Sequence, residues 1–240
     1  MNTLKSMVKS VPGVSKIIRA LRNRYEPVDG FYTLSPDVLI ALTKAFKIQS
    51  NGQNLFDGYG YYEFGMFRGF SFWFAEQISR EYTRTDFGLF GFDSFEGLPR
   101  PQLEVEAAAY KEGYFRGPYE DVIANLKKYG ADFSRIELYR GFFSNELFSK
   151  LRQSETFPPI CICLIDVDLY NSCVPVLEFI KPLLVIGSII LFDDYNQFGA
   201  DNSAGERRAL IEFEQVNIGF QKEHLFNYGW HGAAFRVIAL

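Results

Sequence analysis

Hydrophobic runs and segments with helical spacing alternate along most of the chain. Two continuous apolar runs, at 160–165 and 185–192, have the length and composition of strands that are buried on both faces. Between them, Val174, Leu177 and Ile180 follow the spacing of a helix. The same alternation predicts strands at 61–63, 87–92 and 136–139, and helices at 72–78, 119–129, 145–152 and 204–216. This order predicts an α/β fold in which a mostly parallel sheet carries helices on both faces.

The C-terminal part and one long loop interrupt this alternation. The stretches 220–226 and 233–240 are separated by a loop of hairpin length, so we expect a terminal antiparallel pair. The loop at 101–117 mixes charged and aromatic side chains, which suits a mobile cover over a site. Since no repeat or composition shift divides the chain, we expect a helical N-terminal segment or cap at 1–57 and a single domain at 58–240.

The charged residues are unevenly distributed. The chain has 25 basic and 29 acidic residues, and this net charge of −4 disfavours nucleic acid as a partner and favours a small molecule. The first 25 residues nevertheless hold six basic and no acidic side chains, and 14–25 has the apolar spacing of an amphipathic helix. Such a helix contacts either a membrane surface or an anionic substrate, or it packs on the domain. We favour packing, because six charges on an acidic protein are weak evidence of targeting.

The cysteines and the lengths of the apolar runs help to predict the cellular compartment of the protein. Cys161, Cys163 and Cys173 lie in a mostly apolar stretch, and their odd number argues against a disulfide framework. No run approaches the ~18 to 20 apolar residues of a membrane span. We therefore expect a cytoplasmic protein without a transmembrane segment, whose thiols pack in the interior.

Acidic residues follow four of the expected strands. Glu63 ends the first strand, Asp93 follows the second, Asp166 the fourth, and Asp193 and Asp194 the fifth. In an open parallel sheet, ligands bind beyond the carboxyl ends of the strands, so these carboxylates are expected to face one crevice. Because clustered carboxylates repel one another, the ligand should supply positive charge and hydroxyl groups.

A glycine-containing turn narrows the choice of cofactor. The spacing Glu63-x-Gly65-x-x-x-Gly69 lets the backbone turn sharply and approach a ligand, but Phe67 stands where a dinucleotide-binding turn has its central glycine. A cofactor with an ammonium group and a ribose, such as S-adenosylmethionine, suits Glu63 and Asp93 better than a pyrophosphate does. The alternative is a purely structural turn.

The acids after the last two parallel strands suggest a metal site. Asp166 and Asp168 end one strand, while Asp193 and Asp194 end the next along the chain. Oxygen donors from neighbouring strands suit a hard divalent cation such as Mg²⁺, which would lower the pKa of a bound hydroxyl. The alternative is that these acids cap the helices that follow, most plausibly for Asp168.

Four motifs together resemble the macrocin O-methyltransferase family, whose characterised members methylate sugar hydroxyls of antibiotics. They are Tyr-Glu-Phe-Gly-Met-Phe-Arg-Gly at 62–69, Asp-Ser-Phe-Glu-Gly-Leu-Pro at 93–99, Leu-Ile-Asp-Val-Asp-Leu-Tyr at 164–170 and Phe-Asp-Asp-Tyr at 192–195. The resemblance implies a Rossmann-like class I methyltransferase sheet. It also implies a methyl acceptor that is a small molecule, expected to bear a sugar.

The resemblance further implies roles for individual residues. S-adenosylmethionine would contact Glu63, Gly65, Gly69, Asp93, Ser94, Gly141 and Phe142. Mg²⁺ or another divalent cation would be held by Asp166, Asp193 and Asp194, with Asp166 also the base for the acceptor hydroxyl. We expect Asp168 to orient Asp166, and His231 to be a hydrogen-bonding residue of its loop rather than a catalytic one.

Two other functions are compatible with parts of the pattern. One is a noncatalytic cofactor-binding partner in a polysaccharide or natural-product pathway, which the complete set of aspartates disfavours. The other is a nicotinamide oxidoreductase, which Phe67 disfavours. Whether the chain forms a homo-oligomer stays open at this point.

Overall fold

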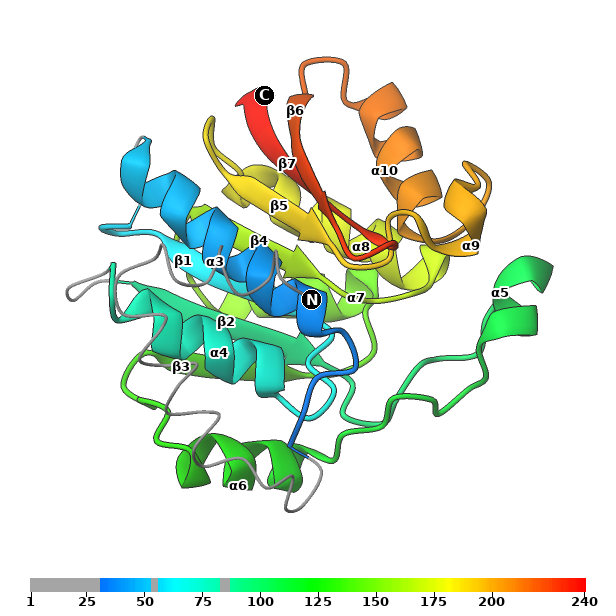
Figure 1. Ribbon diagram of the computed structural model, residues 1–240. Coiled ribbons are helices and arrows are strands. Elements are labelled where there is room, and N and C mark those ends of the chain that lie inside the picture. The colour runs from blue at the N-terminus through cyan, green and yellow to red at the C-terminus, as the bar shows by residue number, and fades with distance from the viewer. Residues whose placement is uncertain (1–30, 53–55, 83–86) are drawn as a thin grey trace, which may run out of the picture.

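The computed structural model describes residues 31–52, 56–82 and 87–240, so the helix expected at 14–25 lies outside the described residues. A seven-stranded sheet in the order β3-β2-β1-β4-β5-β7-β6 forms its centre (Figure 1). The first five of these strands are parallel, and β7 pairs antiparallel with both β5 and β6. The strands are β1 Gly60–Phe64, β2 Gly88–Asp93, β3 Ile136–Arg140, β4 Ile160–Ile165, β5 Ile189–Phe192, β6 Gln221–Tyr228 and β7 Gly232–Ala239.

Helices cover both faces of the sheet, as the alternating pattern predicted. One hydrophobic core joins α3, α4 and α6 to one face, and a second joins α7, α8 and α10 to the other. Consecutive strand residues such as Tyr61 and Tyr62 belong to opposite cores, because successive side chains leave a strand on opposite sides. The helices are α3 Pro36–Asn51, α4 Phe70–Ser79, α5 Glu104–Ala109, α6 Tyr119–Lys128, α7 Asn145–Ser154, α8 Tyr170–Ile180, the short 3₁₀ helix η1 Lys181–Leu183, α9 Gln197–Ala200 and α10 Gly205–Val216.

Two elements differ from the expectation. The apolar run at 185–192 is a strand only from Ile189 onward, because Val185 to Ser188 form a turn in which the Ser188 amide donates to the Val185 carbonyl oxygen over 3.0 Å. In addition, α3 is a long helix that the sequence analysis did not delimit. Its Gln49 amide donates to the carbonyl oxygens of Cys161 and Gly187, each over 2.9 Å, which fixes α3 to the sheet. The division expected between 57 and 58 stays a prediction.

The loop at 101–117 contains ordered structure. We call residues 98–117 the arm; it carries α5, which Figure 1 shows at the tip of a long excursion. The base of the arm is closed by backbone hydrogen bonds between Leu98 and both Gly113 and Tyr114, of 2.9 and 2.8 Å. Gly97 must lack a side chain here, since a Cβ would lie 2.6 Å from the backbone oxygens of both residues.

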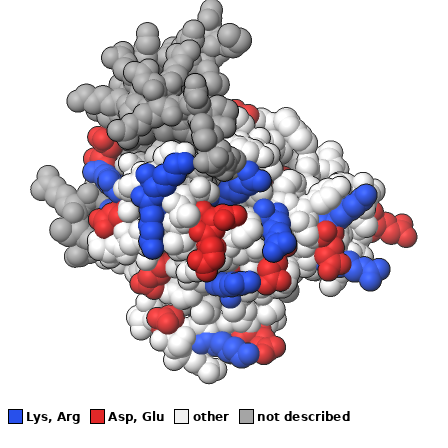
Figure 2. Space-filling view, turned by 90° about the horizontal axis from the view of Figure 1, so that it is seen from below, with Lys and Arg blue, Asp and Glu red and all other residues white. Residues whose placement is uncertain are grey.

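The remaining expectations concern the cysteines, the membrane and the surface. Cys161, Cys163 and Cys173 are buried and free, as expected. Within the described part of the chain, no helix is long and apolar enough to cross a membrane. On the face shown in Figure 2, the described basic and acidic side chains are interspersed rather than gathered by sign.

Candidate active site

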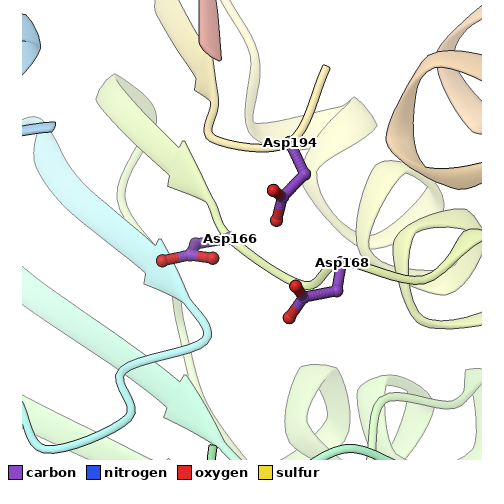
Figure 3. Close-up of side chains that lie close together, drawn as sticks. All are labelled: Asp166, Asp168 and Asp194. Atoms are coloured by element: carbon purple, nitrogen blue, oxygen red, sulfur yellow. The ribbon is translucent and has the colours of Figure 1, made fainter. Parts of the chain in front are cut away.

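Three aspartates come together at the carboxyl ends of β4 and β5. Asp166, Asp168 and Asp194 each offer one oxygen, and these oxygens lie within 4.8 Å of one another (Figure 3). The two strands are neighbours, with Ile165 paired to Phe192, so their following loops start side by side. We call these three residues the acid cluster.

Asp193 lies outside this cluster. Its side chain points toward the hairpin that follows β6, where Oδ2 lies 3.8 Å from Nδ1 of His231. The Oδ1 atom is buried, and the described residues offer it no hydrogen-bond partner within ordinary distance. Asp193 and Asp194 are consecutive, and their side chains leave the backbone toward different neighbours. The structure thus brings Asp168 beside Asp166 and Asp194, and it places the predicted ligand Asp193 beside His231 instead.

The acid cluster is electrostatically unfavourable without a proton or a cation. Burial, followed by the nearby carboxylates, raises the pKa values of Asp166 and Asp194 well above their ordinary range. Burial also raises the pKa of Asp168 to about 6, although a hydrogen bond from Tyr110 opposes the shift. Burial raises the pKa of Asp193 to about 6 as well, opposed by His231. Three oxygen donors at this spacing fit a hard divalent cation, which would relieve the repulsion.

A fully buried glutamate ties together the two loops that carry the cluster. Glu206, in the first turn of α10, accepts hydrogen bonds from the Val167 amide at Oε1 and from the Asp194 amide at Oε2, both of 3.0 Å. Burial raises the pKa of Glu206 well above its usual value, and these two amides oppose the shift. This role of Glu206 is not visible in the sequence, because an acid in the first turn of a helix is ordinarily a solvent-facing residue.

The arm also extends to the loops that surround the acid cluster. Glu106 of α5 is fully buried, and its Oε1 accepts hydrogen bonds from the amides of Tyr170 and Gly205, of 2.8 and 3.1 Å. The Tyr110 hydroxyl accepts a 2.6 Å hydrogen bond from Gln197. These contacts fasten the arm to the first turns of α8 and α10 and to the start of α9, beside the acid cluster.

The glycine turn after β1 packs directly against the acid cluster. Gly65 has a φ of +87°, and a Cβ there would lie 1.7 Å from the backbone oxygen of Asp166. Asp93 holds this turn to the end of β2: Oδ2 accepts from the amides of Met66 and Phe67, over 2.6 and 3.0 Å, and Oδ1 accepts from the Phe95 amide over 2.6 Å. The glycine turn is therefore held by Asp93 on one side and packs against the backbone of the acid cluster on the other.

The predicted cofactor residues divide into two groups. Gly65, Asp93, Ser94, Gly141 and Phe142 line a cavity of about 390 Å³ that also opens onto the acid cluster, Asp193 and His231. Glu63 and Gly69 are not among the lining residues.

Glu63 and Gly69 instead support the turn from behind. Glu63 is fully buried and accepts hydrogen bonds from the hydroxyls of Tyr61 and Ser71, of which Ser71 lines the cavity. Burial raises the pKa of Glu63 to about 8 despite these hydrogen bonds. Gly69 starts α4 with a φ of +81°, where a Cβ would press on Val122.

The sheet order, the antiparallel C-terminal pair and the cavity beyond the strand ends define a Rossmann-like fold of the class I methyltransferase type. The fold matches the structure of the O-methyltransferase NovP with a TM-score of 0.72, at 17% identity over 98% of both chains. It also matches the apo structure of CalS11, a TDP-rhamnose 3′-O-methyltransferase, with a TM-score of 0.60, at 17% identity over 98% of this chain and 92% of that one.

The family follows from the sequence comparison. The chain belongs to the macrocin-O-methyltransferase (TylF) family, whose model matches residues 56–236. A curated relative is the 8-demethyl-8-(2,3-dimethoxy-alpha-L-rhamnosyl)-tetracenomycin-C 4′-O-methyltransferase of Streptomyces olivaceus, 28% identical over 139 residues. That match covers 55% of this chain and 51% of the relative, so it spans about half the relative's length. The resemblance given by the four motifs is thereby confirmed.

Proposed function

We propose that the protein is an S-adenosylmethionine-dependent O-methyltransferase that acts on a sugar hydroxyl with the help of a divalent cation. The observation that carries this proposal is the contact between Gly65 and the backbone of Asp166, which joins the family's glycine turn to the acid cluster in one cavity. A methyl donor on the turn and a hydroxyl at the cluster would then meet.

The lining residues suit this donor. S-adenosylmethionine carries a sulfonium, an ammonium group and ribose hydroxyls, all of which favour an acidic and hydrogen-bonding surface. Asp93 and Ser94 lie at the end of β2, where ribose hydroxyls bind in sheets of this type. Gly141 leaves room beside the half-exposed ring of Phe142 after β3, which we assign to the adenine.

The acid cluster suits a divalent cation, which we propose is held by Asp166, Asp168 and Asp194. When bound, such an ion lowers the pKa of a coordinated hydroxyl and orients it. Glu206 keeps two of the ligand-bearing loops at a fixed separation. Asp193 is assigned to fixing the hairpin through His231 rather than to the metal.

The reaction is a direct methyl transfer. The acceptor oxygen attacks the methyl carbon, the carbon–sulfur bond breaks with its electron pair remaining on sulfur, and S-adenosylhomocysteine is released. The hydroxyl proton passes to the carboxylate of Asp166, which we propose as the base because it lines the cavity directly beside the glycine turn. The arm and the buried aspartates hold donor and acceptor in place, which contributes much of the rate enhancement.

The test measures S-adenosylhomocysteine formation with a panel of glycosides and Mg²⁺. We expect turnover with at least one glycoside, loss of turnover in Asp194→Asn, and unchanged turnover in the matched control Asp201→Asn, whose side chain is exposed. Binding of S-adenosylhomocysteine, measured by calorimetry, should survive in both variants. Failure to bind it, or full activity in Asp194→Asn, would contradict the proposal.

A further inference from the structure

Tyr110 of the arm contacts both loops that carry the acid cluster. Its ring forms a small buried hydrophobic cluster with Leu98 and Leu169, and Phe198 packs against it with the two ring centroids 5.9 Å apart. Leu169 follows Asp168 in the loop after β4, whereas Phe198 lies in α9, after β5. The arm therefore places one ring in contact with the two segments that supply the proposed metal ligands.

The Tyr110 hydroxyl makes a hydrogen bond to each of these segments. It accepts a 2.6 Å hydrogen bond from the Gln197 side-chain amide, and it donates one to the carboxylate of Asp168. One phenolic hydroxyl can do both at once, because it carries one proton and two lone pairs. Tyr110, Gln197 and Asp168 all line the cavity. The hydroxyl thus joins a proposed ligand on one loop to the loop that carries another, Asp194.

The same two segments have an unusual backbone conformation. Asp168 has a φ of +58°, and Phe198, Gly199 and Ala200 in succession have φ values of +56°, +68° and +59°. This left-handed conformation is unfavourable for residues with a side chain, and it persists where the surrounding structure fixes it. Since Tyr110 contacts both Asp168 and Phe198, we attribute part of that support to the arm.

The arm also brings a negative charge to the acid cluster. Glu106 of α5 is fully buried, and the described residues offer its Oε2 atom no hydrogen-bond partner. Burial is the largest cause of the raised pKa of Asp168, and the Glu106 carboxylate adds to it. The arm in its observed position therefore adds a fourth carboxylate to the repulsion within the acid cluster.

We propose that Tyr110 is a positioning residue for the cation of the acid cluster, and that cation binding and closure of the arm favour each other; this inference rests on the proposed function. The hydroxyl keeps Asp168 turned toward Asp166 and Asp194, and the ring keeps the loops after β4 and β5 together. A bound cation offsets the repulsion between Glu106 and the acid cluster, which stabilises the closed arm. Because such a coupling is reciprocal, the factor by which the closed arm tightens cation binding equals the factor by which the cation favours closure.

The first experiment measures cation affinity, so it does not depend on turnover. Metal-free protein is titrated with Mn²⁺ in a calorimeter. The variant Tyr110→Phe retains the ring and loses only the hydroxyl, and it should bind the ion roughly tenfold more weakly. The matched control is Tyr114→Phe on the same arm, whose side chain is exposed and does not line the cavity, so its affinity should be unchanged.

A double variant separates positioning from a general effect on the fold. In an Asp168→Asn background, Tyr110→Phe should have little further effect on Mn²⁺ affinity, because the hydroxyl acts through that carboxylate. An unchanged affinity in Tyr110→Phe alone, or an equal loss with and without Asp168→Asn, would overturn the proposal.

The second experiment follows the arm by hydrogen exchange measured with NMR. The amides of Tyr170 and Gly205 donate to Glu106, so their exchange reports detachment of the arm. Mg²⁺ should slow this exchange about tenfold in the unmodified protein, and Tyr110→Phe should lose most of that protection. The Gly187 amide, which donates to Val237 at the other end of the sheet, is the reference and should not respond.

The outcomes distinguish this inference from the proposed function. Exchange at the two reporting amides that is the same with and without Mg²⁺ would overturn the coupling. If the unmodified protein binds no divalent cation, the metal part of the proposed function fails and this inference fails with it. If the unmodified protein and Tyr110→Phe bind the cation equally tightly, the inference alone fails.

Discussion

Replacing Glu206 by glutamine tests how the acid cluster is held in place. Glu206 presents an acceptor oxygen to the Val167 amide and another to the Asp194 amide. Glutamine keeps one acceptor and turns an NH₂ group toward the other amide, which leaves a buried donor without a partner. Such a loss costs about 1 to 3 kcal/mol, which lowers the melting temperature by roughly 2 to 12 °C in a chain of this length.

The more informative effect is on metal affinity. One of the two amides belongs to Asp194 itself, and the other, of Val167, lies between Asp166 and Asp168 in the chain, so the loss of either hydrogen bond displaces a proposed ligand. Loss of a group that orients metal ligands typically lowers affinity about 10- to 100-fold. Calorimetric titration of the metal-free variant with Mg²⁺ or Mn²⁺ measures this change directly, without reference to activity.

A matched variant separates the specific effect from general destabilisation. Glu76 is also a fully buried glutamate, but it lies in α4, on the opposite face of the sheet from α10, and pairs with Arg80 and Arg135. Glu76→Gln should destabilise the fold at least as much, because it weakens a buried ion pair, while leaving metal affinity unchanged. If Glu206→Gln binds the metal as tightly as the unmodified protein, or if both variants lose affinity equally, the positioning role is refuted.

Three further outcomes are expected. Burial raises the pKa of Glu63 from 4.5 to about 8, so between these two pH values the folded chain retains a proton that the unfolded chain has released. The free energy of unfolding, measured in EDTA, should therefore fall as the pH rises from 4.5 to about 8. A melting temperature that stays flat or rises over this pH range would contradict the prediction. In urea unfolding, Gly65→Ala should lower the free energy of unfolding by roughly 3 kcal/mol or more. Gly113 has a similar φ but open space around it, so Gly113→Ala should lower this free energy by about 1 kcal/mol. Asp168→Asn should weaken Mg²⁺ binding at least about tenfold and Asp193→Asn should leave it nearly unchanged; the reverse order would restore the ligand set expected from the sequence.

The arrangement of strands and helices was predictable because it depends on simple periodicity. Fully apolar runs such as Ile160–Ile165 are buried on both faces, and a parallel sheet between two layers of helices provides that environment. The turn at 185–188 was not predictable in the same way. The apolar side chain of Val185 continues the hydrophobic run, and the Ser188 hydroxyl oxygen accepts a hydrogen bond from the Val185 amide. Val185 is only partly buried and Ile186 is 54% exposed, so two apolar residues continue the hydrophobic run although they lie in a turn at the surface.

The candidate site was predictable in position but not in the direction of each side chain. That aspartates follow β4 and β5 is visible in the sequence. Which of them converge depends on backbone geometry: Asp168 has a φ of +58°, a conformation that aspartate tolerates and that no pattern of residues reveals. The roles of Glu106 and Glu206 depend on amides far away in the sequence, so neither could be distinguished from a surface acid.

The most direct measurement follows a labelled methyl group. The protein is incubated with S-adenosylmethionine carrying a ¹³C methyl group and with an aryl glycoside, and the products are observed by NMR. We predict a new ¹³C methoxy signal on the sugar with Mg²⁺ present, its loss in EDTA, its return on adding Mg²⁺, and its absence in Asp194→Asn. Transfer of the label that is equally fast in EDTA would contradict metal assistance, and label that never reaches a sugar oxygen would contradict the proposed reaction itself.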